Sequence, residues 1–126
     1  MRVGIDLVQI SQMASSLDRF GERFARKVFT EGEIAYCTKD TRLAAQRFAA
    51  RFAAKEATVK VLRPEGRWVR WRDIEVRRDA SGWCDIVLHD RAATLARAAG
   101  LGSMALSMSH QADFAAAIVI AAIEGA

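Results

Sequence analysis

The spacing of hydrophobic residues changes along the chain, and each change predicts a boundary between strand and helix. Residues 2–10 predict a strand that is apolar on both faces, because apolar residues occupy both parities of an alternating pattern. These residues are Val3, Ile5 and Leu7 on one parity and Val8 and Ile10 on the other. We therefore expect both faces of this strand to be buried.

A helix is expected directly after this strand, with Ser11 as its N-cap. Its apolar residues recur at steps of three and four and form a single stripe. The stripe contains Met13, Leu17, Phe20, Phe24 and Val28. Thr30 and Glu33 then have the spacing of a capping box, which predicts a second, short helical segment through Tyr36.

The longest predicted helix covers residues 43–62, where nearly all residues favour a helix and Phe48, Phe52 and Val59 share one face. Pro64 ends this helix. The next elements are strands at residues 73–76 and 83–88 and a helix at 91–99. The chain then forms a second hairpin, in which an alternating strand from residue 104 pairs with an apolar strand at 114–123 across a turn at 109–113.

The order of elements is therefore strand, helix, helix, hairpin, helix, hairpin. This order predicts an α+β fold in which helices pack on one side of a mainly antiparallel sheet. The chain has 126 residues, of which 52% are hydrophobic. That length is below the roughly 150 residues typical of one domain, so we expect a single domain at 1–126.

Composition excludes several classes of protein. Nineteen basic and fifteen acidic side chains give a net charge of +4, which favours acidic partners but is too little for a nucleic-acid coat. Cys37 and Cys84 lack C-x-x-C spacing, which argues against a disulfide framework or zinc knuckle and favours the cytoplasm. The apolar run 114–123 is too short to span a bilayer at about 20 residues per crossing. Asp6 interrupts any signal peptide, so a soluble protein without a membrane partner is expected.

Two carboxylates occupy unusual positions. Asp6 lies in the middle of the apolar strand, and Glu56 lies at the edge of the buried stripe of helix 43–62, one turn before Lys60. Alone, Asp6 would pair with an arginine or cap a helix, and Glu56 with Lys60 would be an ordinary surface pair. Together, the two carboxylates form a sparse oxygen site that suits Mg²⁺ with substrate phosphate oxygens, and Lys60 supplies a charge to the phosphate.

His110 follows an alternating strand at the mouth of a turn. It is either a structural histidine or a donor to a phosphate group, and no second histidine has the spacing of a zinc ligand.

Two basic regions have two interpretations each. Arg19, Arg23, Arg26 and Lys27 lie within about 100° on one face of the first predicted helix, either as a ridge for an acidic helical partner or as a solvated face. Residues 63–78 mix arginines with Trp68 and Trp71, which would stack on nucleobases or simply form a loop and strand.

Five blocks, in order along nearly the whole chain, resemble the holo-acyl-carrier-protein synthase family. They are residues 4–10 (GIDLVQI), 29–33 (FTEGE), 47–57 (RFAARFAAKEA), 71–76 (WRDIEV) and 107–110 (SMSH). The RFAAKEA block at 51–57, together with the upstream GID, is the most specific part.

This resemblance implies a 4′-phosphopantetheinyl transferase fold and a Mg²⁺-dependent reaction in the cytoplasm. The reaction would move the phosphopantetheine arm of coenzyme A to a serine of an apo acyl carrier protein of fatty acid or polyketide synthesis, releasing adenosine 3′,5′-bisphosphate. Asp6 and Glu56 match the family's metal-ligand positions, Lys60 matches the lysine near the diphosphate, and these three residues would carry the catalysis.

The family also implies further contacts for this chain. Arg51, Lys55 and His110, together with Lys60, match positions that line the coenzyme A site. The basic ridge of Arg19, Arg23, Arg26 and Lys27 suits an acidic carrier protein. The family forms homotrimers whose active sites lie at the clefts between subunits.

Three features depart from the family pattern. Gln12 stands where many members have a basic residue, residues 63–70 are richer in Arg and Trp than usual, and Trp83-Cys84 replaces a basic residue and proline. These departures affect the choice of partner more than the chemistry. Two alternatives remain: a catalytically silent paralogue that binds carrier proteins, which should have lost the carboxylates, and a basic nucleic-acid-binding module, which leaves them unexplained.

Overall fold

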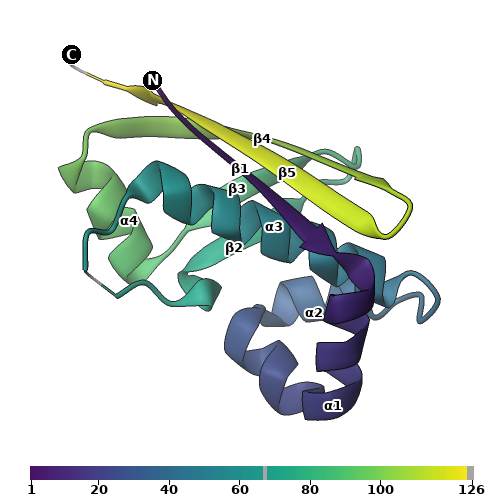
Figure 1. Cartoon of the computed structure of the whole chain (residues 1–126). Coiled ribbons are helices and arrows are strands. Elements are labelled where there is room, and N and C mark those ends of the chain that lie inside the picture. The colour runs from purple at the N-terminus through teal and green to yellow at the C-terminus, as the bar shows by residue number, and fades with distance from the viewer. Residues whose placement is uncertain (67, 125–126) are drawn as a thin grey trace.

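A computed structural model describes residues 1–66 and 68–124 of the chain. The elements, in order, are β1 (Arg2–Gln9), α1 (Ile10–Val28), α2 (Glu31–Cys37), α3 (Ala44–Leu62), a short 3₁₀ helix η1 (Trp71–Asp73), β2 (Ile74–Arg78), β3 (Cys84–Leu88), α4 (Asp90–Ala98), β4 (Leu101–Gln111) and β5 (Phe114–Ile123). This order, shown in Figure 1, confirms the predicted α+β fold.

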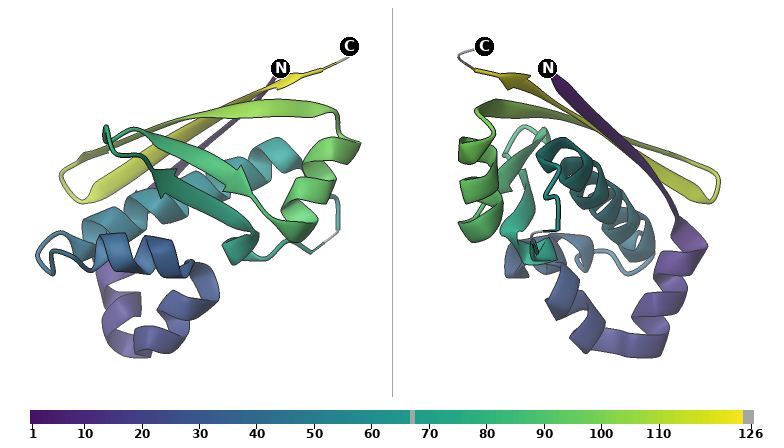
Figure 2. Two further views of the ribbon diagram at one scale, coloured as in Figure 1. Left: turned by 180° about the vertical axis from the view of Figure 1, so that it is seen from behind. Right: turned by 60° about the vertical axis from the view of Figure 1, so that its left-hand side comes forward.

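The strands form two antiparallel sheets. The larger sheet has the order β1-β5-β4, and β2 and β3 form a separate two-stranded hairpin. Helix α3 packs along one face of the larger sheet, where it contacts β1 and β5, and all the helices lie on that same side (Figures 1 and 2). Within the residues that the structure describes, no helix covers the opposite face of the larger sheet.

Small residues allow α3 to lie close to the sheet. Ala53, Ala54 and Ala57 are fully buried, and they pack in the same clusters as Ala117 and Val119 of β5. Because alanine also favours the helix, the same residues satisfy both local structure and packing. The alanine-rich sequence is therefore the reason that α3 occupies the centre of the molecule.

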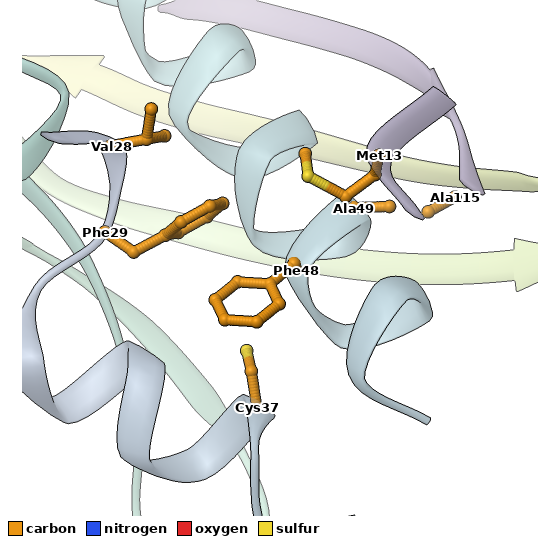
Figure 3. Packing of buried hydrophobic residues seen from close by; sticks show 7 residues of the cluster. All are labelled: Met13, Val28, Phe29, Cys37, Phe48, Ala49 and Ala115. Atoms are coloured by element: carbon orange, nitrogen blue, oxygen red, sulfur yellow. The ribbon is translucent and has the colours of Figure 1, made fainter. Parts of the chain in front are cut away.

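A second part of the core lies where α1, α2 and α3 meet (Figure 3). The Phe29 and Phe48 rings pack at a tilt of 52° with their centroids 4.7 Å apart. The predicted capping box begins α2: Thr30 accepts the Glu33 N–H, and the Glu33 carboxylate accepts the Thr30 N–H. The cap and the aromatic pair together hold α2 against α3.

Three expectations about the N-terminal elements are wrong. Ser11 does not cap α1, because its N–H and hydroxyl donate to Asp113 and the helix begins at Ile10 without a side-chain cap. Gly21 interrupts α1 with φ 59°, a conformation that glycine adopts easily, so the apolar stripe is not continuous and Phe20 is 58% exposed. The strand β1 is buried on one face only, since Val3, Ile5 and Leu7 are 58%, 62% and 63% exposed.

The last hairpin also differs from expectation. The strand β4 runs from Leu101 through Gln111, so the predicted turn at 109–113 shrinks to Ala112 and Asp113. His110 therefore lies within β4, opposite Ala115 of β5, and not in a loop.

Candidate active site

A close approach between β1 and α3 brings the two predicted carboxylates together. A Cβ atom at Gly4 would lie 2.0 Å from the Ala57 carbonyl oxygen, so only glycine allows the helix to pack this closely. Asp6 follows Gly4 on β1, and Glu56 precedes Ala57 on α3. The geometry of the site therefore depends on a residue that carries no side chain.

Lys60 connects the same two elements. Its ammonium donates to the Ile5 carbonyl oxygen at 2.6 Å and lies 3.3 Å from Asp6 Oδ1. The Asp6 side chain is 20% exposed, so the carboxylate is neither buried in the core nor fully solvated. Asp6 is 54 residues from Lys60 in the sequence, yet Asp6, Glu56 and Lys60 share one side of the β1 and α3 contact.

The surroundings of Glu56 in this cluster disfavour the ionised form of its carboxyl group. Burial raises the pKa of its carboxyl group, the negative charge of Asp6 raises it further, and Lys60 only partly opposes these effects. No hydrogen bond to the Glu56 carboxylate is found within the described part of the chain. Two carboxylates therefore share one lysine, and the cluster is poised to attract a cation or a proton.

The donor set fits Mg²⁺ only together with a ligand. Among residues 1–66 and 68–124, no group of three or more His, Cys, Asp or Glu side chains could hold a metal ion. Two carboxylate oxygens are nevertheless the usual protein contribution to a Mg²⁺ site that is completed by phosphate oxygens and water. Burial and the charge of Asp6 raise the pKa of Glu56, and an additional positive charge would oppose this change.

Arg51 belongs to a second cluster of positive charge. The guanidinium groups of Arg47, Arg51 and Arg78 lie 4.6, 4.3 and 5.4 Å from the ring centroid of Tyr36. Arg51 is only 5% exposed, and its hydrogen bonds go to the Arg47 carbonyl oxygen and weakly to the Cys84 thiol. A buried guanidinium without a carboxylate among the described residues is suited to binding an anion.

His110 opens onto the same region as Arg51. A cleft of about 290 Å³ is lined by both residues, together with Gln46 and Tyr36. His110 Nε2 lies 3.2 Å from Gln46 Nε2. The structure therefore brings two of the predicted ligand-binding residues to one cleft.

Lys55 is placed elsewhere. Its side chain is fully buried, its ammonium lies 2.8 Å from Glu33 Oε1, and it donates to the carbonyl oxygens of Trp71 and Ile74. Burial lowers the pKa of Lys55, and the Glu33 carboxylate opposes this change. The ammonium cannot reach a ligand at the surface without breaking these bonds, and this geometry argues against the predicted contact of Lys55 with coenzyme A.

Sequence reasoning did not find this buried network. Glu33 also accepts the Val76 N–H, and its neighbour Glu75 accepts from Thr30, Arg77 and His89. Burial alone would raise the pKa of Glu75, but these hydrogen bonds outweigh it and lower the pKa. One signal was available, because Lys55 follows Phe48 by seven residues and so falls on the same buried helix face.

The predicted basic ridge does not lie on one continuous helix face. Arg19 precedes the break at Gly21, whereas Arg23, Arg26 and Lys27 follow it. All four are exposed, and Arg26 forms a surface ion pair with Glu22 at 3.6 Å. Arg23, Arg26 and Lys27 remain close together in the sequence after the break. The direction of Arg19 is independent of theirs, because Arg19 lies in the helical segment before Gly21.

The sequence and the fold match a known family. Residues 2–119 match the model of the 4′-phosphopantetheinyl transferase superfamily, and the chain belongs to this superfamily. It is 43% identical over 118 residues to the holo-[acyl-carrier-protein] synthase of Koribacter versatilis, a match that covers 93% of this chain and 94% of that protein. The sequence-based prediction of an enzyme of the holo-acyl-carrier-protein synthase type is confirmed.

Solved structures agree with this assignment. Helicobacter pylori holo-[acyl-carrier-protein] synthase in complex with coenzyme A has a TM-score of 0.82 at 27% identity, covering 95% of this chain and 99% of that one. The Chronobacterium ammoniagenes synthase, also in complex with coenzyme A, has a TM-score of 0.83 at 33% identity, covering 98% and 97%. Within the described residues, no helix has the length and apolar character needed to cross a membrane.

Proposed function

We propose that this protein transfers the 4′-phosphopantetheine arm of coenzyme A to a serine hydroxyl of an apo acyl carrier protein. Mg²⁺ is the cofactor of this reaction, and adenosine 3′,5′-bisphosphate is the second product. The observation that carries this proposal is the placement of Asp6 and Glu56 around one lysine, held by the close contact at Gly4. The family assignment favours this function over nucleic-acid binding, which gives the two carboxylates no role.

Asp6 and Glu56 would hold the metal ion, which would supply positive charge to the diphosphate oxygens. In the reaction, the serine oxygen bonds to the phosphorus next to the pantetheine, and the bond from that phosphorus to the bridging oxygen breaks. A carboxylate oxygen of Glu56 accepts the proton from the serine hydroxyl. Lys60 offsets the charge that develops on the leaving phosphate.

The cationic cleft would bind the nucleotide end of coenzyme A. Arg51 has the buried charge that an anion would satisfy, and His110 lies at the opening of the same cleft. Both residues are donors to phosphate oxygens at neutral pH, His110 through a ring N–H.

A homotrimer with active sites between subunits would explain the uncovered sheet face. Val3, Ile5 and Leu7 expose a row of large apolar side chains on β1, and a second copy of the chain would bury them. Sedimentation of a particle of about three times 13.9 kDa is expected, and a monomer at micromolar concentration would contradict this part of the proposal.

The acidic carrier protein would dock on the basic residues of α1. Reversing Arg23 and Arg26 together to Glu should raise the carrier KM about tenfold or more at low salt and leave the coenzyme A KM unchanged. Arg19 remains in the proposed docking set, and reversing it alone measures its share on the other side of the break at Gly21.

The roles of Asp6 and Glu56 are tested by amide substitutions, which remove the charge of each side chain and keep its shape. Glu56→Gln and Asp6→Asn should each lower the transfer rate by about 10²-fold or more, because each removes a metal ligand and Glu56→Gln also removes the base. Asp85→Asn on β3, an exposed carboxylate, is the matched control and should transfer normally. The intact mass of the carrier protein measures the product. Full activity of either site variant would contradict the assignment, and carrier binding without turnover by the unmodified protein would favour the silent paralogue.

A further inference from the structure

A cavity of about 750 Å³ lies beside η1, at the C-terminal end of α1 and the N-terminal end of α4. Trp68 and Trp71 line it. Trp68 comes from the segment 63–70 that is richer in Arg and Trp than the family pattern, and Trp71 begins the block 71–76 that resembles the family. The clefts around Arg51 share no lining residue with it. Figure 2 shows β2 and α4, which flank this region, beside α3, and α4 also packs against β4 of the larger sheet. The proposed transfer reaction gives this cavity no role.

The deep part of the cavity has a buried acceptor and an aromatic surface. Asp73 is only 5% exposed and lines both this cavity and an adjoining one of about 400 Å³. Within the described residues, no hydrogen bond or ion pair reaches its carboxylate. The indole of Trp71 is half-buried and is held by the Phe52 ring, with centroids 5.1 Å apart. Because Asp73 lines the cavity, its carboxylate can accept a hydrogen bond from a ligand that carries N–H or O–H groups.

The rim of the cavity carries three basic residues and one exposed acidic residue, Asp90. Lys27, Arg70 and Arg72 line it and are exposed, and none of them forms an ion pair with a described residue. The Arg70 guanidinium lies 5.5 Å from the ring centroid of Trp68. The rim therefore offers free cationic donors, and the indoles offer flat surfaces beside them.

We propose that this cavity binds a nucleoside monophosphate. The base stacks on the indoles, a base amino group or ribose hydroxyl donates to Asp73, and the phosphate binds to Lys27 and Arg72. An aromatic acid would lack the donor for Asp73, and an inorganic anion would leave the indoles unused. The volume is within the range of about 300–1,000 Å³ of small-molecule sites.

Tryptophan fluorescence tests this proposal directly. The test protein carries Trp83→Phe, which removes an exposed indole outside the cavity and leaves Trp68 and Trp71 to report. AMP, GMP, CMP and UMP are titrated separately, with adenosine and inorganic phosphate as partial ligands. We expect a saturable change with at least one nucleotide, and affinity about tenfold weaker or more for the matching nucleoside or for phosphate alone.

Charge reversal at the rim sharpens the test. Arg72→Glu should weaken nucleotide binding about tenfold or more, whereas Arg97→Glu, an exposed arginine on α4 that does not line the cavity, should leave it unchanged. No saturable change with any of the four nucleotides, or an equal effect of the two reversals, would overturn the proposal. Transfer to the carrier protein by the Trp83→Phe protein is measured separately, so failure of the cavity and failure of the proposed transferase function are distinguishable.

Discussion

Lys55 and Glu56 are neighbours on α3, yet their charges are in opposite situations. Lys55 is fully buried and has a carboxylate and two carbonyl oxygens as partners. Glu56 is half-buried beside a second carboxylate, Asp6, and shares the exposed Lys60 with it. The first charge is satisfied by the fold, and the second is not.

This difference separates a structural role for Lys55 from a chemical role for Glu56. A satisfied buried charge fixes α3 against α2 and β2, and it has nothing left to offer a ligand. An incompletely neutralised carboxylate pair at the edge of the core is held in place by packing and can still bind a metal cation. Adjacent positions in one helix can therefore have unrelated roles, which substitutions at each position should reveal.

Lys55→Met should give the largest effect on stability. It leaves Glu33 buried without its ammonium partner, so the free energy of unfolding should fall by about 3–5 kcal/mol, measured by urea denaturation. The matched control is Lys60→Met on the same helix, where an exposed ion pair is lost and the fall should be below about 1 kcal/mol. An equal fall in the free energy of unfolding for the two variants would contradict the claim that Lys55 is a buried structural charge and Lys60 an exposed one. Lys60→Met should instead lower the transfer rate.

Gly4→Ala should affect both stability and activity. The new methyl group would meet the Ala57 carbonyl oxygen, so β1 and α3 must move apart at a cost of about 1–3 kcal/mol, and the transfer rate should fall as Asp6 separates from Glu56. Gly102→Ala is the control, because the nearest atoms there belong to the flexible Glu124 side chain. A Gly4→Ala protein as stable and as active as the control would show that the close approach does not set the site.

The smallest predicted effect is a pH dependence of stability. Because the pKa of Glu56 is raised above its usual value of 4.5, the native state binds the proton more tightly than the unfolded state does. Ionisation of Glu56 should therefore lower the free energy of unfolding as pH rises from about 4.5 through the native pKa. Urea denaturation at several pH values should show this fall in the unmodified protein relative to Glu56→Gln. A constant difference between the two proteins would contradict the raised pKa.

The sequence predicted most elements because their signals are local. The capping box of Thr30 and Glu33 and the apolar run of β5 depend on residues close together in the chain. Two local expectations failed for physical reasons. A glycine in a helical pattern does not reveal whether it will take a positive φ, as Gly21 does, and a serine before a helix can donate to a distant residue, as Ser11 does to Asp113.

The site was predictable only in part. Asp6, Glu56 and Lys60 stood out as charges at the edges of apolar patterns, and the structure brings them together. The burial of Lys55 depends on Glu33, which is distant in sequence, and the three arginines around Tyr36 come from two separate elements. The exposed face of β1 could not be foreseen, because an apolar pattern does not say whether its own chain or another copy covers it.

The most direct test of the transferase function is the intact mass of an apo acyl carrier protein after incubation with this protein and coenzyme A. We predict a gain of one phosphopantetheine per carrier with Mg²⁺ present and no gain with a chelator in its place. The same gain under chelator would contradict the role of Asp6 and Glu56 as metal ligands. No gain under either condition with several carrier proteins would contradict the transferase function itself.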